Sequence, residues 1–142
     1  MTQLLVASRN VKKLQEMRRI VERAGIEGVE VLGLDEVPPF EEAPEIGSTF
    51  EDNAVAKARD AVAATGLPSV ADDSGISVDA LNGMPGVLSA RWAGTAKDDA
   101  ANNDLLLRQL DDVPDAHRTA QFVCAMALVG PCLLYTSDAA DE

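Results

Sequence analysis

The chain has 142 residues, of which 46% are hydrophobic and 25% are charged, and its formal net charge is −12. This composition is that of one globular domain, and the acidic charge argues against a partner such as duplex nucleic acid, whose binding depends on lysines and arginines. With no apolar run of about 18 residues and no signal-peptide pattern, we expect no membrane segment. The two cysteines fit neither a disulfide framework nor a metal-binding spacing, so we expect a reducing, cytoplasmic setting.

The N-terminal part is predicted to form a strand, a polar loop, a helix and a second strand. Residues 4–7 are an apolar run of strand length, and residues 8–10 interrupt it. Apolar side chains then recur at three- and four-residue intervals over residues 14–24, which is the pattern of one helix face. Gly25 is expected to cap this helix, and residues 29–31 alternate as in a strand.

An acidic, proline-containing loop is predicted to lead into an alanine-rich helix. Residues 35–47 contain three prolines and five acidic residues, which indicates irregular structure. Ser48 and Glu51 have the spacing of a capping box, so we expect a helix to begin there. The helix is expected to cover about residues 50–65 and to end at Gly66.

The rest of the chain alternates strands with turns and a third helix. Residues 70–71 predict a brief strand that runs into Asp72-Asp73-Ser74-Gly75, and residues 76–78 predict another strand. Three further elements are expected: a turn at residues 82–86, a helix at residues 97–110 and a strand at residues 120–129. Because strands and helices interleave, the predicted class is α/β.

The last eleven residues do not continue this pattern. Residues 132–142 resemble the translation of a transposon-end sequencing adapter, and no turn or periodicity links them to the strand before them. We therefore exclude them from the predicted fold as a non-native tail and assign residues 1–131 to one domain. On this interpretation the reading frame was cut short, and the strand at residues 120–129 is left with an unpaired edge.

Three segments carry side chains suited to phosphate and metal chemistry. The first lies where a strand meets a helix N-terminus, whose free amides and dipole favour anions, although turn formation would explain the same residue types. Its members are Ser8, Arg9, Asn10, Val11, Lys12 and Lys13.

The other two segments are acidic. Glu41, Glu42 and Glu45 precede the alanine-rich helix and are able to ligate a hard cation, although the helix dipole alone also favours acidic residues there. Asp72 and Asp73 follow a strand, at the position where open α/β sheets place ligands, with turn formation as the plain alternative. Because successive strand residues face opposite ways, we expect only one of these two carboxylates to face the cleft.

Together the segments resemble the inosine triphosphate pyrophosphatase family in order and spacing. The matching motifs are Ser8-x-Asn10-x-x-Lys13, Gly47-x-Thr49-Phe50-x-x-Asn53-Ala54-x-x-Lys57-Ala58 and Ala71-Asp72-Asp73-Ser74-Gly75, continued by residues 82–86, 89–94 and 120–124. The resemblance extends from Leu4 to about Pro131. Two positions depart from the family pattern, since Arg9 stands where Gly is common and Trp92 where Tyr or Phe is usual.

The resemblance implies a fold and an activity. The fold would be ITPase-like, of the Maf/Ham1 type, with a central mixed sheet flanked by helices and its C-terminal part missing. The activity would be Mg²⁺-dependent hydrolysis of non-standard purine nucleoside triphosphates (ITP, dITP and XTP) to the monophosphate and pyrophosphate. Family members are cytoplasmic and dimeric, so a homodimer is expected for a complete chain.

The resemblance also implies roles for particular residues. The segment from Ser8 to Lys13 would grip the triphosphate, and Ser74 would contact the substrate. Asp73 would be the proton acceptor and a metal ligand, and Glu45 the second Mg²⁺ carboxylate, with Glu42 as the alternative. His117 lies far from these motifs and is expected at the surface.

Two other functions stay open at this point. A nucleotide-binding module without turnover would use the same loops, and a related pyrophosphatase would differ only in base preference. Family members continue with a C-terminal segment that helps to hold the base, and its motifs do not occur here. We therefore expect the chain by itself to be poorly soluble or partly unfolded and to have little activity.

Overall fold

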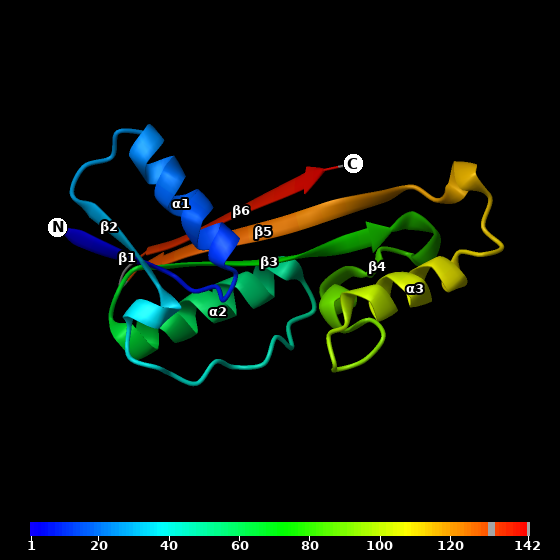
Figure 1. Ribbon diagram of the computed structural model, residues 1–142, viewed down its shortest axis with the longest axis horizontal. Helices are drawn as coiled ribbons and strands as arrows, with labels where there is room; N and C mark the ends of the chain where they lie inside the picture. Colours follow the sequence, from blue (N-terminus) through cyan, green and yellow to red (C-terminus); the bar gives the residue numbers. More distant parts are fainter. Residues whose placement is uncertain (131–132, 142) are drawn as a thin grey trace.

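A mixed sheet forms the centre of the computed structural model, which describes residues 1–130 and 133–141 (Figure 1). Helix α1 (Val11–Arg23) lies on one face of the sheet and helix α2 (Phe50–Thr65) on the other. The strand order is β2 (Val29–Gly33), β1 (Thr2–Val6), β3 (Ser69–Val78), β5 (Ala120–Gly130) and β6 (Leu133–Asp141), with β4 (Met84–Pro85) beside β3. The first three strands are parallel, and β5 and β6 run antiparallel, which confirms the predicted α/β class.

Helix α2 covers the predicted residues, but its N-cap is not the predicted one. The Thr49 hydroxyl accepts a hydrogen bond from the Asp52 amide at 3.0 Å. Thr49 still has extended backbone, so its side chain reaches back over the first helical turn, and the prediction that Ser48 caps the helix was wrong. Gly66, with φ 72°, ends the helix in the left-handed conformation that glycine adopts without strain.

Strand β3 is one continuous element of ten residues, and the prediction of two short strands was wrong. The Asp-Asp-Ser-Gly run does not leave the sheet, because every position from Ser69 to Val78 is paired with β5. Pairing of the backbone with a neighbour outweighs the turn preference of these side chains. On the opposite edge β1 pairs only with Ser69 and Val70, so β3 continues past the end of β1. Asp72 and Asp73 lie in this part of β3, beyond the last residue that pairs with β1.

Small residues form the packing surface between α2 and the sheet. Ala54, Ala58 and Ala61 are fully buried on α2 and contact the same cluster as Ala71 and Ala127 on the strands beneath. Side chains of this size allow the helix backbone to lie close to the sheet. Helix α1 contrasts with α2, since none of its residues is fully buried.

The remaining elements gather at the far ends of β3 and β5 (Figure 1). They are the short helices η2 (Asp79–Leu81), η3 (Gly86–Arg91) and η4 (Asp115–His117), strand β4 and helix α3 (Asp99–Gln109), while η1 (Leu34–Glu36) follows β2. Asn82 and Gly83 have φ of 55° and 87°, which confirms the predicted turn. His117 is exposed, as expected. In the described part of the chain, no helix combines the length and apolar character that a bilayer requires.

Strand β6 corrects two expectations about the tail. The backbone of residues 133–141 lies antiparallel to β5, in a register from Gly130 opposite Leu133 to Phe122 opposite Asp141. Residues 133–141 therefore take part in the fold, and the edge of β5 is paired, contrary to both expectations. The physical reason is that strand pairing uses backbone amides and carbonyls, which almost any proline-free segment supplies. The non-native origin of residues 132–142 stays a prediction.

Candidate active site

The loop between β1 and α1 is stabilised by its own polar side chains. Ser8 Oγ accepts a hydrogen bond from the Asn10 amide at 3.1 Å, and Asn10 Oδ1 accepts one from the Lys12 amide at 3.0 Å, which makes Asn10 the N-cap of α1. The first turn of α1 contains no acidic residue. Lysines at a helix N-terminus are unfavourable next to the helix dipole, so this arrangement suits an anion bound between them.

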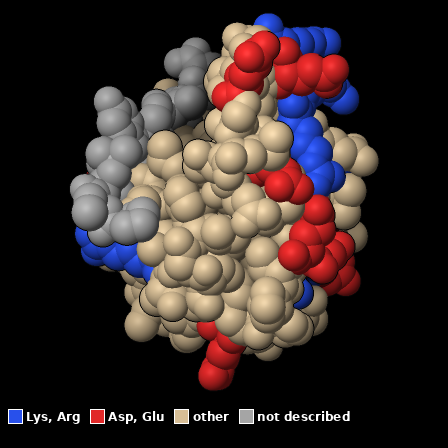
Figure 2. Space-filling model, turned by 90° about the vertical axis from the view of Figure 1, so that its left-hand side faces the viewer, with Lys and Arg blue, Asp and Glu red and all other residues tan. Residues whose placement is uncertain are grey.

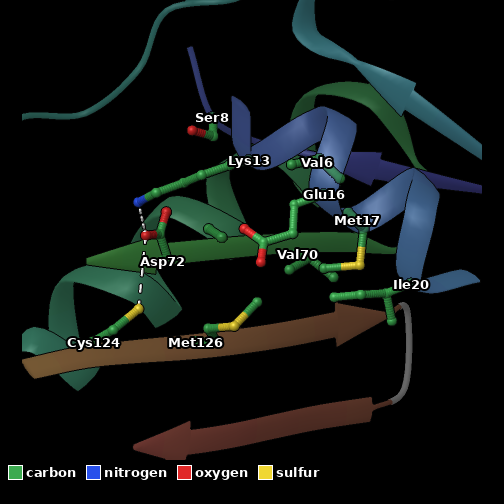
Figure 3. A pocket seen from close by; sticks show the side chains of 11 residues that line it. Val6, Ser8, Lys13, Glu16, Met17, Ile20, Val70, Asp72, Cys124 and Met126 are labelled. Atoms are coloured by element: carbon green, nitrogen blue, oxygen red, sulfur yellow. Dashed lines mark hydrogen bonds and ion pairs between the residues drawn. The ribbon is translucent and has the colours of Figure 1, made fainter. Parts of the chain in front are cut away.

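Lys13 extends from α1 toward β3. Its Nζ forms an ion pair with Asp72 Oδ2, and Cys124 Sγ lies 3.9 Å from the same oxygen (Figure 3). The Asp72 side chain is only 10% exposed, whereas that of Lys13 is 38% exposed. The buried carboxylate is therefore neutralised by a lysine that still reaches solvent. Burial, followed by the nearby Asp72 charge, raises the pKa of the Cys124 thiol, so this cysteine is held in its neutral form.

A cavity of about 210 Å³ opens beneath this ion pair, between α1 and the sheet. In Figure 3 Lys13 and Asp72 lie at one end of it, and the remainder is lined by the Glu16 carboxylate together with mostly apolar side chains of α1, β3 and β5. The apolar lining includes Met17, Ile20 and Met126.

The other predicted members of the first segment point outward. Val11 is 61% exposed, and Lys12 is also exposed. Arg9 Nη2 lies 3.2 Å from Glu42 Oε1, so Glu42 is paired with the loop.

Asp73 lies on the opposite face of β3, toward α2. Its Oδ2 accepts a hydrogen bond from Asn53 Nδ2 at 2.9 Å, and the residue is 8% exposed. Burial raises the pKa of Asp73, the Asn53 hydrogen bond opposes this rise, and the nearby Glu45 carboxylate adds to it. Asp72 and Asp73 thus face opposite sides of the sheet, which confirms the expected alternation.

Glu45 is the acidic loop residue that lies near Asp73. Its Oε1 is 2.6 Å from Lys57 Nζ, and the same ammonium donates to the Asp72 carbonyl at 2.8 Å. Two nitrogens of the Arg91 guanidinium lie 3.4 Å from the Glu45 carbonyl. The acidic loop is therefore connected both to β3 and to η3.

Asn53, Lys57 and Arg91 were not among the predicted site residues. Asn53 and Lys57 belong to one of the matching motifs, and their separation of four places both on one side of α2. That spacing was the available signal. The contacts of Arg91 join residues 46 positions apart, and no local pattern indicates them.

Charged side chains of the described residues occupy separate parts of the surface and do not form one continuous patch on the face drawn in Figure 2. On the face drawn in Figure 2, Lys and Arg side chains lie next to Asp and Glu along one side, and the broad centre is uncharged. An acidic chain can bind a phosphorylated ligand when its cations are concentrated at one position.

Asp73 and Glu45 are suited to hold Mg²⁺ together with a phosphorylated ligand. Among the described residues, no group of three or more His, Cys, Asp or Glu side chains forms a metal cage. Mg²⁺ commonly takes one or two carboxylates and completes its octahedron with water and phosphate oxygens. The two hard oxygen donors fit this mode. Glu45 raises the pKa of Asp73 and the Lys57 ammonium lowers it, so positive charge close to Asp73 favours the ionised carboxylate.

Similar proteins are known by sequence. The family model described as "Ham1 family" matches residues 4–139. A protein named dITP/XTP pyrophosphatase from Nocardia farcinica is 70% identical over 131 residues, which cover 92% of this chain and 64% of that protein. One of the same name from Mycobacterium tuberculosis H37Rv is 66% identical over 128 residues, which cover 90% of this chain and 63% of that protein.

Similar solved structures share the fold. The crystal structure of a nucleoside-triphosphatase, dITP/XTP pyrophosphatase, from Mycobacterium abscessus has a TM-score of 0.88 at 56% identity, covering 98% of this chain and 71% of that chain. A Ham1 protein from Staphylococcus aureus gives 0.84 at 37% identity, with 99% and 71% covered. The chain spans slightly less than two thirds of the length of the curated relatives that it matches. On the evidence of this family match and these relatives, the chain belongs to the Ham1 family.

Proposed function

We propose that this chain carries the triphosphate-binding and hydrolytic residues of a Mg²⁺-dependent pyrophosphatase acting on dITP, XTP and ITP. The observation that carries the proposal is the pair Asp72 and Asp73 on the open edge of β3. One carboxylate is paired with Lys13 beside a helix N-terminus, and the other lies with Glu45 and Lys57. The names of the relatives from Nocardia farcinica and Mycobacterium tuberculosis favour two of these substrates, dITP and XTP.

Lys13 and the N-terminus of α1 are proposed to bind the phosphates. Ser8 and Asn10 fix the loop, Arg9 and Lys12 add positive charge at its rim, and the backbone at Val11 supplies helix N-terminal amides. When a phosphate is bound, Lys13 can contact it while staying near Asp72, because its side chain reaches solvent. Ser74 is exposed on the same edge of β3 and is proposed to contact the substrate.

Asp73 is proposed to accept a proton from the attacking water. The water oxygen bonds to the α-phosphorus, the bond from that phosphorus to the bridging oxygen breaks, and the monophosphate and pyrophosphate leave. Mg²⁺ held by Asp73 and Glu45, rather than Glu42, would neutralise phosphate charge and orient the pyrophosphate leaving group.

An extended chain provides the direct test. It joins residues 1–131 to the part of the Nocardia farcinica relative that lies beyond the matched residues. We expect it to release pyrophosphate from dITP and XTP, faster than from dGTP, and only when Mg²⁺ is present. Nucleotide binding without pyrophosphate release would favour a binding module, and equal rates on all triphosphates would indicate a different base preference.

The 142-residue chain is the matched control for that test. We expect these 142 residues to release pyrophosphate far more slowly than the extended chain, because they do not include the base-binding motifs that the family resemblance implies. Equal turnover by the two chains would contradict this expectation. Sedimentation of the extended chain would test the proposed homodimer, and the cytoplasmic setting stays a prediction.

A further inference from the structure

The side chain of Asn53 bonds one carboxylate of the proposed cation site, that of Asp73, and the backbone of the loop that carries the other, Glu45. It is 2% exposed, and both ends of its amide have partners. Nδ2 donates to Asp73 Oδ2 at 2.9 Å, and Oδ1 accepts from the Gly47 amide at 2.7 Å. A backbone amide can only donate and an ionised carboxylate can only accept, so these partners determine the orientation of the Asn53 amide.

Gly47 is required for this contact. A Cβ at residue 47 would lie 2.6 Å from Asn53 Oδ1 and 2.9 Å from Asp52 Cβ, both closer than real Cβ atoms come. The backbone at Gly47 is therefore close to Asn53 because it has no side chain. Glu45 lies two residues earlier in the same loop, so the bond to Gly47 also restrains the position of Glu45.

We propose that Asn53 is a positioning residue that sets the separation of Asp73 and Glu45, and thereby the affinity of the site for a divalent cation. Asn53 reaches Asp73 directly and Glu45 only through the Gly47 backbone, so it would act through these two residues and not as a metal ligand itself. The inference rests on the proposed cation site. A neutral amide is suited to this place because it binds a carboxylate without the positive charge that would compete with the metal.

Asn102 provides a matched control for the bonding of a buried asparagine. It is 7% exposed, its Oδ1 accepts from the Ala93 amide at 2.7 Å, and its Nδ2 donates to the Ala90 carbonyl at 2.9 Å. Asn102 is therefore buried like Asn53, and its two hydrogen bonds have the same lengths as those of Asn53. It differs in that it lies on α3 and connects only backbone groups.

The test is a Mn²⁺ titration followed by the broadening of amide NMR signals, which needs no turnover. It is made on the 142-residue chain and repeated on the extended chain. In the unsubstituted protein, the Gly47 and Asp73 amides should broaden at the lowest Mn²⁺ concentrations. Asn53→Ala should raise the Mn²⁺ concentration at half-maximal broadening about tenfold, which is the scale of a lost metal-supporting partner. Asn102→Ala should leave this midpoint concentration unchanged. Thermal unfolding should show similar stability losses in both variants.

Gly47→Ala keeps the Asn53 amide but displaces it, so the midpoint Mn²⁺ concentration should rise in this variant as well. If Asn53→Ala does not fold, Gly47→Ala takes its place as the test. Equal midpoints in the unsubstituted protein and in the folded Asn53→Ala variant would overturn the inference. So would an equal rise in Asn102→Ala, because the effect would then be a general loss of packing. If Mn²⁺ broadens no signals near Gly47 and Asp73 in the unsubstituted protein, the proposed cation site itself is wrong.

Discussion

The two helices that cover the sheet pack in different ways. Helix α2 buries Asn53, Ala54, Ala58 and Ala61, whereas α1 buries no residue, and Ile20 on α1 is 52% exposed. The carboxylate on the α2 side is held by a buried hydrogen bond. The carboxylate on the α1 side is held by an ion pair whose lysine reaches solvent.

In the proposed site, this difference in packing would separate two tasks. Groups that hold a small cation must keep their geometry before the ligand arrives, and close packing of small side chains provides that rigidity. A positively charged side chain that binds a long polyphosphate must adapt its position to the ligand. A flexible lysine on a lightly packed helix can do so. We infer that the α2 side is preorganised and that the α1 side adjusts to the substrate.

The largest expected effect is on the preorganised side. In the extended chain, Asp73→Asn should lower kcat for dITP by at least about 100-fold, because it removes the proposed proton acceptor and a metal ligand. Steady-state pyrophosphate release measures this, with Asp72→Asn as the comparison. If Asp72→Asn abolishes turnover and Asp73→Asn does not, the two faces have been assigned the wrong way round.

Lys13→Ala tests the adaptable side. It should lower kcat/KM for dITP. The corresponding loss of transition-state stabilisation should be about 2–3 kcal/mol, the scale of a lost charge-assisted phosphate contact. Stability should fall by only about 1 kcal/mol, since the lysine is partly exposed and its ion pair is screened. Combining Lys13→Ala with Asp72→Asn should restore that stability but not the activity. Unchanged kcat/KM in Lys13→Ala would remove Lys13 from the proposed site.

The packing difference can be measured by stability alone. Ala58→Leu should destabilise the chain by about 1–3 kcal/mol, because the fully buried alanine has no room for extra methylene groups. Ile20→Ala should cost less than about 1 kcal/mol, since that side chain is half exposed. Urea unfolding measures both, and the reverse order would contradict the comparison.

The smallest expected effect is on how the stability of the folded chain depends on pH. Burial raises the pKa of Asp73 above its ordinary value of 3.8, so the folded chain keeps this proton to higher pH than the unfolded chain does. The stability that protonated Asp73 contributes is fully present below the pKa of Asp73 in the unfolded chain. It is lost as the pH rises through the pKa of Asp73 in the folded chain. Without metal, Asp73→Asn should therefore gain stability relative to the unsubstituted chain from about pH 4 upward.

Urea unfolding in EDTA at several pH values measures this difference. The lowered pKa of Glu36 acts with the opposite sign, but it is common to both chains and cancels. A difference that is flat or shrinks with rising pH would refute the assigned direction. Adding Mg²⁺ should reduce the difference, because the cation stabilises the ionised carboxylate.

Sequence patterns predicted the elements whose causes are local. The span of α2 follows from the alanine-rich segment and from Gly66, and both are visible in the sequence. The continuity of β3 was missed because Asp, Ser and Gly favour turns, and only the pairing with β5 keeps them in the sheet. The bond from Asn53 to Gly47 depends on a close approach of the loop to α2, which no periodicity indicates.

The register of β3 makes the site sensitive to changes in chain length. Asp72 and Asp73 have different partners only because adjacent residues of a strand face opposite ways. Deleting one residue between Ser69 and Asp72, with the rest of the strand kept in place, would turn each later side chain to the other face. Asp73 would then take the lysine-paired position, and Ser74, which has no carboxylate, would take the cation position. During evolution, this segment should therefore accept point substitutions more readily than single-residue insertions or deletions.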